Sequence, residues 1–133
     1  MSLFNKSKNF KKQGDTGLAL AIAWFAKNEF TVCLPLTDSQ DYDLIVESEG
    51  ELKRVQVRTT TQIAASGKFM VNLRVLGGNR SGTGVVKKSQ ALKYDVLFVV
   101  TDHGDQYLIP KCDIERLSSL LTLNDSTERY RVS

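Results

Sequence analysis

Residues 42–60, YDLIVESEGELKRVQVRTT, decide the fold of this chain. Two runs that are rich in β-branched residues lie on either side of the dipeptide Glu49-Gly50. Such runs around a glycine-containing turn are typical of an antiparallel hairpin. The sequence therefore predicts one strand over residues 42–47 and a second over residues 52–60.

The second predicted strand has two chemically different faces. Successive side chains of a strand point to opposite sides, so Val55 and Val57 share the face expected in the core. Arg54, Gln56 and Arg58 form a polar stripe on the other face. This face must meet water, a ligand or a metal ion.

A carboxylate at the start of the first strand gives this stripe a chemical use. If the hairpin closes at its Glu-Gly turn, Asp43 lies close to Gln56 and Arg58. Carboxylate and amide oxygens are ligands for Mg²⁺, and a nearby cation stabilises the charge of a phosphodiester transition state. Two plainer interpretations stay open: Asp43 is a turn acid at a strand end, and the polar stripe only faces solvent.

The rest of the chain predicts an α/β fold with a mixed, mainly antiparallel central sheet flanked by helices. We expect residues 1–12 to be a basic flexible arm and residues 13–133 to be a single domain. The glycine-rich loop over residues 77–84 lacks the P-loop pattern. The other expected elements are a helix from Asp15 or Thr16 to about residue 28, strands over 30–36, 68–76, 96–101 and 106–109, a helical or irregular segment over 85–92, and a last helix over 113–121.

Composition excludes several classes of protein. The chain has 133 residues, of which 41% are hydrophobic and 25% charged, as is usual for one globular domain. It has neither an apolar run of about 18 residues for a membrane span nor a secretory signal pattern, so we expect no membrane partner and a cytoplasmic location. Two cysteines, Cys33 and Cys112, are too few for a disulfide scaffold and are expected to be reduced core residues.

Charge is unevenly distributed along the chain. The net charge is only +3, but residues 52–94 contain nine basic residues and no Asp or Glu. This segregation predicts one positive face that binds a polyanion such as DNA, although a solvated basic surface without a ligand has the same pattern. The nine basic residues are Lys53, Arg54, Arg58, Lys68, Arg74, Arg80, Lys87, Lys88 and Lys93.

Four segments together resemble a known family. They are KKQGDTGLALAIAWFAKNEFTVCLPLTDSQDYDLIVES (11–48), RVQVRTT (54–60), KYDVLFVV (93–100) and YLIP (107–110). In order and spacing they resemble the PD-(D/E)XK nuclease superfamily, especially the cyanobacterial group I intron homing endonuclease-like group, in which Gln replaces the second acid. Archaeal Holliday-junction resolvases are more distantly similar. The resemblance covers roughly residues 11–110.

The resemblance implies a restriction-endonuclease-like fold and a metal-dependent DNA endonuclease that uses Mg²⁺ or Mn²⁺. Asp43 matches the metal-binding Asp of the family, Gln56 matches its D/E/Q position, and Arg58 matches its catalytic Lys. Asp43 and Gln56 are therefore the expected metal ligands. The basic residues other than Arg58 are the expected DNA contacts, and cutting both strands of a duplex implies a homodimer or homotetramer.

Two positions depart from the family pattern. Leu18 stands where the first helix normally supplies a Glu, and Arg58 is bulkier than Lys and stays protonated. Asp15 and Asp41 are candidate compensating acids. Besides the endonuclease with this altered site, two alternatives stay open: a catalytically decayed DNA-binding module on the same fold, and a protein-interaction domain that binds no nucleic acid.

Overall fold

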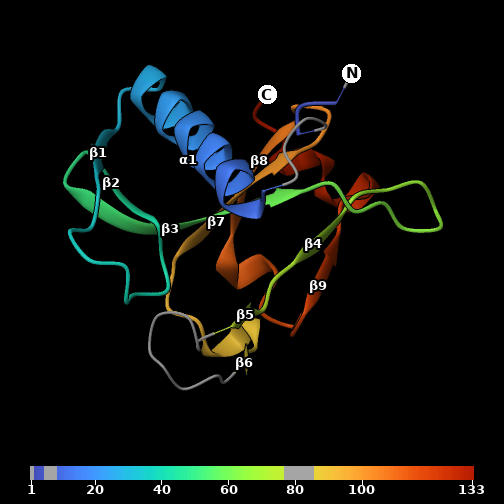
Figure 1. Cartoon of the computed structure of the whole chain (residues 1–133). Helices are drawn as coiled ribbons and strands as arrows, with labels where there is room; N and C mark the ends of the chain where they lie inside the picture. The colour runs from blue at the N-terminus through green and yellow to red at the C-terminus, as the bar shows by residue number, and fades with distance from the viewer. Residues whose placement is uncertain (1, 5–8, 77–85) are drawn as a thin grey trace.

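The computed structural model describes residues 2–4, 9–76 and 86–133 (Figure 1). None of the described helices is long and apolar enough to span a membrane. In chain order, the elements are α1 (Phe10–Lys27), β1 (Thr31–Cys33), β2 (Leu44–Ser48), β3 (Glu51–Thr60), β4 (Met70–Asn72), β5 (Val75–Leu76), β6 (Val86–Lys87), the 3₁₀ helix η1 (Ser89–Ala91), β7 (Val96–Thr101), β8 (Gln106–Pro110), the 3₁₀ helix η2 (Lys111–Asp113), β9 (Leu120–Thr122) and the 3₁₀ helix η3 (Asp125–Tyr130).

The central sheet has five strands in the order β1-β2-β3-β7-β8. All of its neighbouring pairs are antiparallel except β3 and β7, which are parallel. This confirms the predicted mixed, mainly antiparallel sheet. The long strand β3 is central because it pairs with the hairpin partner β2 on one side and with the distant strand β7 on the other.

The β2–β3 hairpin forms because its turn residues accept a left-handed backbone. Glu49 has φ of 54° and Gly50 has φ of 82°. Two successive positive φ values match the right-handed twist of the flanking strands. The Gly50 N–H also donates to the Glu47 carboxylate at 3.0 Å. The hairpin register then aligns Leu44 with Val55.

Strand β7 joins two hydrophobic cores. All six of its residues are buried, as a continuous apolar run predicts for a strand that is covered on both faces. Phe98 belongs to the core beneath α1, whereas Leu97 and Val99 belong to the core on the opposite face. Helix α1 packs very closely on β3, since a Cβ atom at Gly17 would lie 2.3 Å from Thr59 Cγ2.

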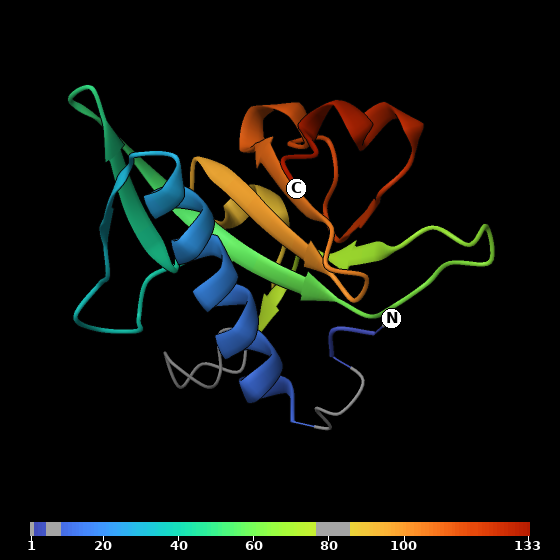
Figure 2. The ribbon, with the colours of Figure 1, turned by 90° about the horizontal axis from the view of Figure 1, so that it is seen from above.

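Figure 2 shows α1 on one side of the sheet and the C-terminal segment on the other. The second face is covered by short elements rather than by a helix: the two-stranded sheet β4–β9 and the 3₁₀ helices. The predicted helix over residues 113–121 is therefore wrong. Ile114 and Leu121 have helical spacing and are buried, but Leu121 pairs with Val71 in the β4–β9 ladder. Tertiary pairing overrides the local pattern here.

The N-terminal region differs from the predicted arm. Helix α1 begins at Phe10, because the Asn9 side chain caps it by accepting from the Lys11 N–H at 2.9 Å. The expected caps at Asp15 and Thr16 therefore lie inside the helix. Phe4 is buried and its N–H donates to the Asp102 carboxylate at 2.6 Å, so residues 2–4 pack against the domain.

Three further predictions are corrected. The expected strand over residues 68–76 is divided into β4 and β5, and the segment over 85–92, expected to be helical or irregular, contains the short strand β6 as well as the 3₁₀ helix η1. Cys33 and Cys112 are both exposed, not core residues, because they occupy an edge strand and a surface 3₁₀ turn. The glycine-rich loop over 77–84 lies outside the described residues.

Candidate active site

The candidate site forms where β2 separates from β3. The Asp43 N–H donates to the Val55 carbonyl at 2.8 Å, which continues the ladder by one step. The Asp43 carboxylate then accepts the Val57 N–H at 2.8 Å, so a side chain takes the place of the next backbone partner. This bond fixes a carboxylate at an opening beside the central strand, and the prediction that Asp43 lies near residues 56–58 is confirmed.

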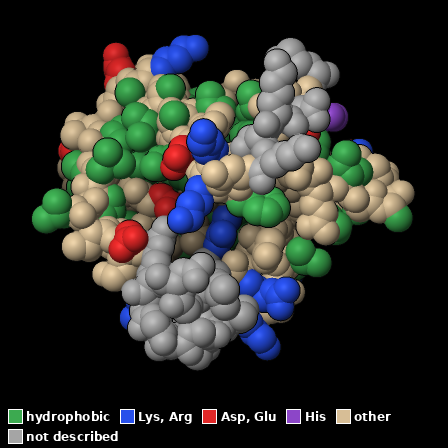
Figure 3. Space-filling view, in the orientation of Figure 1, with side chains coloured by type: hydrophobic (Ala, Val, Ile, Leu, Met, Phe, Trp, Pro, Cys, Tyr) green, Lys and Arg blue, Asp and Glu red, His purple; other side chains and the backbone are tan. Residues whose placement is uncertain are grey.

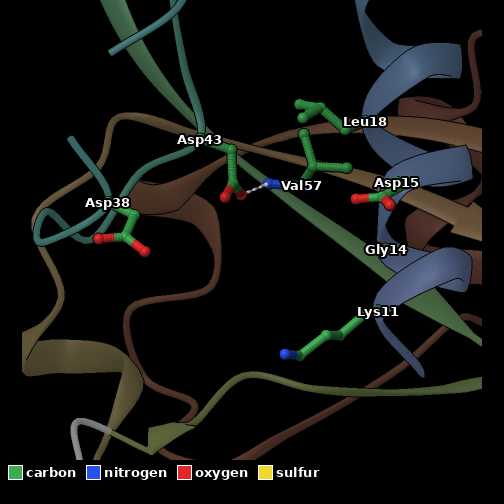
Figure 4. A pocket seen from close by; sticks show the side chains of 7 residues that line it. All are labelled: Lys11, Gly14, Asp15, Leu18, Asp38, Asp43 and Val57. Carbon is green, nitrogen blue, oxygen red and sulfur yellow. Dashed lines mark hydrogen bonds between the residues drawn. The ribbon is translucent and has the colours of Figure 1, made fainter. Parts of the chain in front are cut away.

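Helix α1 forms the opposite wall of this opening (Figure 4). Lys11, Gly14, Asp15 and Leu18 have spacings of three, four and seven residues, which place them on one face of a helix. With Asp38, Asp43 and Val57 they line a cleft of about 730 Å³. An added Cβ at Gly14 would meet no atom within 4 Å, so this glycine contributes open space.

The cleft is rich in charge. Asp15, Asp38 and Asp43 bring three carboxylates into its lining, and Lys11 brings one ammonium group. The sequence pointed to Asp15 and Leu18, and the structure brings both to the same cleft as Asp43. Lys11 and Asp38 were missed. The missed signal for Lys11 is its spacing to Asp15 and Leu18, which only becomes helical spacing once the helix starts at Phe10.

Gln56 lies behind the cleft rather than in its lining. Its side chain is only 5% exposed. The Nε2 amide donates to the Asp41 carbonyl at 3.0 Å, and its buried Oε1 atom has no hydrogen-bond partner among the described residues. The Asp41 carboxylate accepts the Lys93 N–H at 3.0 Å and is not part of the cleft lining. Asp41 therefore positions Gln56 instead of joining Asp43 in the cleft.

Arg58 lines a neighbouring pocket of about 390 Å³. Its Nη2 atom donates to the Arg74 carbonyl at 3.2 Å. This pocket and the main cleft share Gly14 and Val57, so they adjoin each other along β3. Arg58 is near the predicted site, but its guanidinium is anchored beside the cleft that contains Asp43.

The match to a family model extends over nearly the whole domain. The model of the PD-(D/E)XK endonuclease family matches residues 8–131. The chain belongs to the PD-(D/E)XK endonuclease family. Among solved structures, it is similar to the bacterial homing endonuclease I-Ssp6803I, with 24% identity and a TM-score of 0.71 over 91% of this chain and 87% of that chain. No curated protein matches the chain.

The donor atoms at this PD-(D/E)XK site fit a hard divalent cation in an open site. The described residues contain no group of three or more His, Cys, Asp or Glu that is close enough to enclose a metal ion. Mg²⁺ does not need such a cage, because it keeps several waters and usually takes one or two carboxylates together with substrate phosphates. The Asp43 carboxylate and the unbonded Oε1 atom of Gln56 are oxygen donors of the required kind.

The basic residues of this PD-(D/E)XK chain are distributed unequally around the cleft. In Figure 3, Lys and Arg side chains follow one another down the middle of one face, with acidic side chains beside them. Arg80 and the Lys87 side chain lie outside the described residues. Of the other predicted DNA contacts, Lys53, Lys68, Arg74, Lys88 and Lys93 are exposed.

Arg54 differs from the other predicted DNA contacts because it is held by an acid. Its Nε and Nη2 atoms donate to the two Asp95 carboxylate oxygens at 3.1 and 3.0 Å. Hydrogen bonding to Arg54 lowers the pKa of Asp95, and the same bonds raise the pKa of Arg54. This pair lies just before the point where β3 begins to pair with β7, at Val55 and Val96, so Arg54 contributes less free positive charge than the sequence suggests.

Proposed function

We propose that this chain is a metal-dependent DNA endonuclease of the homing endonuclease-like group, which hydrolyses phosphodiester bonds in the cleft between α1 and β3. The observation that carries the proposal is the Asp43 carboxylate, held at the mouth of the cleft by the Val57 N–H. The Asp43 carboxylate accepts this hydrogen bond and still lines the open cleft, so a phosphate has access to it. The similar structure, a bacterial homing endonuclease, supports the choice of group.

The roles of the residues follow from their positions. Asp43 and Gln56 hold Mg²⁺ or Mn²⁺, which supplies positive charge to the phosphate when it is bound. Arg58 stabilises negative charge on the DNA next to the cleft, since a guanidinium stays protonated and cannot act as a base. Asp15 supplies the second carboxylate that the departure at Leu18 removes, because both face the same cleft.

The reaction itself is a hydrolysis. The oxygen of a water molecule forms a bond to phosphorus, the bond from phosphorus to one sugar oxygen breaks, and that oxygen takes up a proton while the attacking water loses one. The exposed basic residues around the cleft hold the DNA backbone during this step. Cutting both strands of a duplex requires two such sites, so we propose that the active species is a homodimer or homotetramer.

A second candidate function rests on the same departures. The helix carries Leu18 where the family has an acid, and the Arg58 guanidinium is engaged by the Arg74 carbonyl. These observations favour a DNA-binding module that has lost catalysis. The basic residues are equally compatible with both candidates.

Plasmid nicking tests the proposal. Supercoiled DNA is incubated with Mg²⁺ or Mn²⁺ and with wild type, Asp43→Asn or Lys27→Ala, in which an exposed lysine at the far end of α1 is removed. We expect nicking by wild type and Lys27→Ala but not by Asp43→Asn. A gel shift in EDTA accompanies the assay. A shift without nicking selects the DNA-binding module, and neither shift nor nicking rejects both.

A further inference from the structure

Lys11 lies in the first turn of α1, and its side chain extends into the cleft that contains Asp43 (Figure 4). The side chain is exposed, and among the described residues its ammonium forms no ion pair. Its ammonium is therefore not neutralised by an ion pair within the part of the chain that the structure describes. Lys11 is also the one cation in the described lining of this cleft.

Arg58, the residue expected to supply the catalytic cation, is placed differently. Residues 57 and 58 point to opposite faces of β3, and Val57 is the one that lines the cleft with α1. Arg58 lines the adjoining pocket, where its guanidinium donates to the Arg74 carbonyl at 3.2 Å. The positive charge in the Asp43 cleft thus comes from the helix and not from the strand.

The charge of the cleft lining also favours such a cation. Three carboxylates, from Asp15, Asp38 and Asp43, carry three negative charges and by themselves repel a phosphodiester. A bound divalent cation would offset two of these charges, and the Lys11 ammonium offsets the third. An ammonium is suited to the task because it is a compact charge with three donors on a flexible stem.

We infer that Lys11 is a catalytic residue that takes over the role of the catalytic lysine from the β3 position now occupied by Arg58. Its ammonium contacts a non-bridging oxygen of the scissile phosphate and stabilises the negative charge that grows during water attack. It transfers no proton and forms no covalent bond. The inference rests on the proposed endonuclease activity, because it names the group that contacts the phosphate in the same cleft.

The first test compares single-turnover cleavage rates at saturating DNA with Mg²⁺ for wild type, Lys11→Ala, Lys11→Arg and Arg58→Ala. Lys27→Ala is the control, since it removes an exposed lysine from the other end of the same helix. Removing one oriented donor from a developing oxyanion costs about 10²–10³-fold in rate. We expect a loss of this size in Lys11→Ala, a partial recovery in Lys11→Arg and in Lys11→Ala with added ethylammonium, and a smaller loss in Arg58→Ala.

A purely structural role would give a different pattern. It would lower the melting temperature and would not respond to ethylammonium. Wild-type rates in Lys11→Ala, or a loss confined to Arg58→Ala, would overturn the inference and assign the charge to β3.

The second test does not depend on cleavage. Lysines of the wild-type chain are reductively methylated in EDTA with and without a DNA duplex, and the modification at Lys11 and Lys27 is read by mass spectrometry. We expect DNA to slow methylation of Lys11 at least several-fold and to leave Lys27 unchanged.

The two tests separate the two claims. Protection of Lys11 in a chain that never nicks DNA would reject the endonuclease while keeping the phosphate contact in the cleft. Equal methylation of Lys11 with and without DNA would overturn the inference even if wild type cleaves.

Discussion

At the scale of the residue, Leu18 is the side chain that we predict to stand at the acid position of the family. It lines the cleft next to Gly14 and Asp15 and is only partly buried. A partly buried position beside open space tolerates a polar side chain far better than a closed core does. Leu18 thus borders the cleft and also packs against the core beneath α1.

Restoring the family residues is expected to raise activity. In the double variant Leu18→Glu, Arg58→Lys, the new carboxylate faces Asp43 across the cleft and the smaller ammonium replaces the anchored guanidinium. We expect faster metal-dependent nicking than in wild type, or nicking where wild type has none. Catalytic groups act together, so each single change is expected to do little.

The control for the double variant is its thermal stability. A carboxylate forced into a closed core without a partner would cost several kcal/mol and melt the protein early. Because Leu18 borders the cleft, we expect a melting temperature close to that of wild type. A folded double variant that binds DNA and cuts no faster would contradict the assignment of Leu18 to the acid position.

Part of the site was predictable from residues alone. Asp43 was placed correctly near residues 56–58 because hairpin register fixes which side chains meet. Lys11 was missed because the helix start was placed too late: Asn9 is the cap, and a cap six or seven residues further on leaves Lys11 in a loop. Asp38 was missed because nothing in the spacing of a connecting segment indicates where its side chains point.

At the scale of the element, the Arg54–Asp95 pair joins β3 to the chain just before β7, where the pairing of the two strands begins. The Arg54 N–H and guanidinium both donate to the Asp95 carboxylate, and the Asp95 N–H donates to the Arg54 carbonyl at 2.9 Å. The pair therefore sets the register of the one parallel pairing in the central sheet.

Acid is expected to weaken this junction. The pKa of Asp95 is lowered in the folded chain, chiefly by its hydrogen bonds to Arg54, so its stabilisation is present above the pKa of the unfolded carboxyl and is lost as pH falls through the folded pKa. Both side chains are about 40% exposed, so we expect a contribution of about 1 kcal/mol or less. We predict that Asp95→Asn lowers the melting temperature at pH 7 and that the difference from wild type shrinks below about pH 4.

Glu115→Gln is the control, because it removes an exposed acid. A difference that stays constant with pH would show that the charge of Asp95 does not matter.

Elements differ in how far the sequence predicts them. The β2–β3 hairpin and the buried strand β7 follow from local patterns, a Glu-Gly turn and a continuous apolar run. The segment after Asp113 has helical spacing too, yet it forms β9 because β4 offers a partner about 50 residues away in sequence. The pairing of β9 with β4 depends on the whole fold, so the local sequence of residues 113–121 does not reveal it.

At the scale of the whole molecule, basic side chains follow one another down the middle of one face, with acidic side chains beside them (Figure 3). Residues 52–94 supply nine of the 18 Lys and Arg residues and no acid. Neutralising phosphates releases bound counterions, so DNA affinity should fall steeply as salt rises. The prediction concerns binding alone and holds whether or not the chain cleaves.

We therefore expect Arg74→Ala, Lys88→Ala to weaken DNA binding and to reduce the slope of log affinity against log salt by about 2, about 1 for each lost contact. Fluorescence anisotropy in EDTA at several salt concentrations measures the slope. Lys27→Ala, Arg116→Ala is charge-matched and removes exposed residues away from this region. Equal slopes in the two double variants would mean that net charge, and not this face, attracts DNA.

The separation of β2 from β3 has a consequence for how safely this protein folds. A strand without a partner exposes backbone groups that template pairing with another copy of the chain, and such edges promote aggregation. Here the Asp43 side chain occupies the Val57 N–H, and α1 packs against Thr59 one step further along. The Val57 N–H is thus satisfied within the chain, so β3 offers one backbone donor fewer to another copy of the chain at the point where it leaves β2.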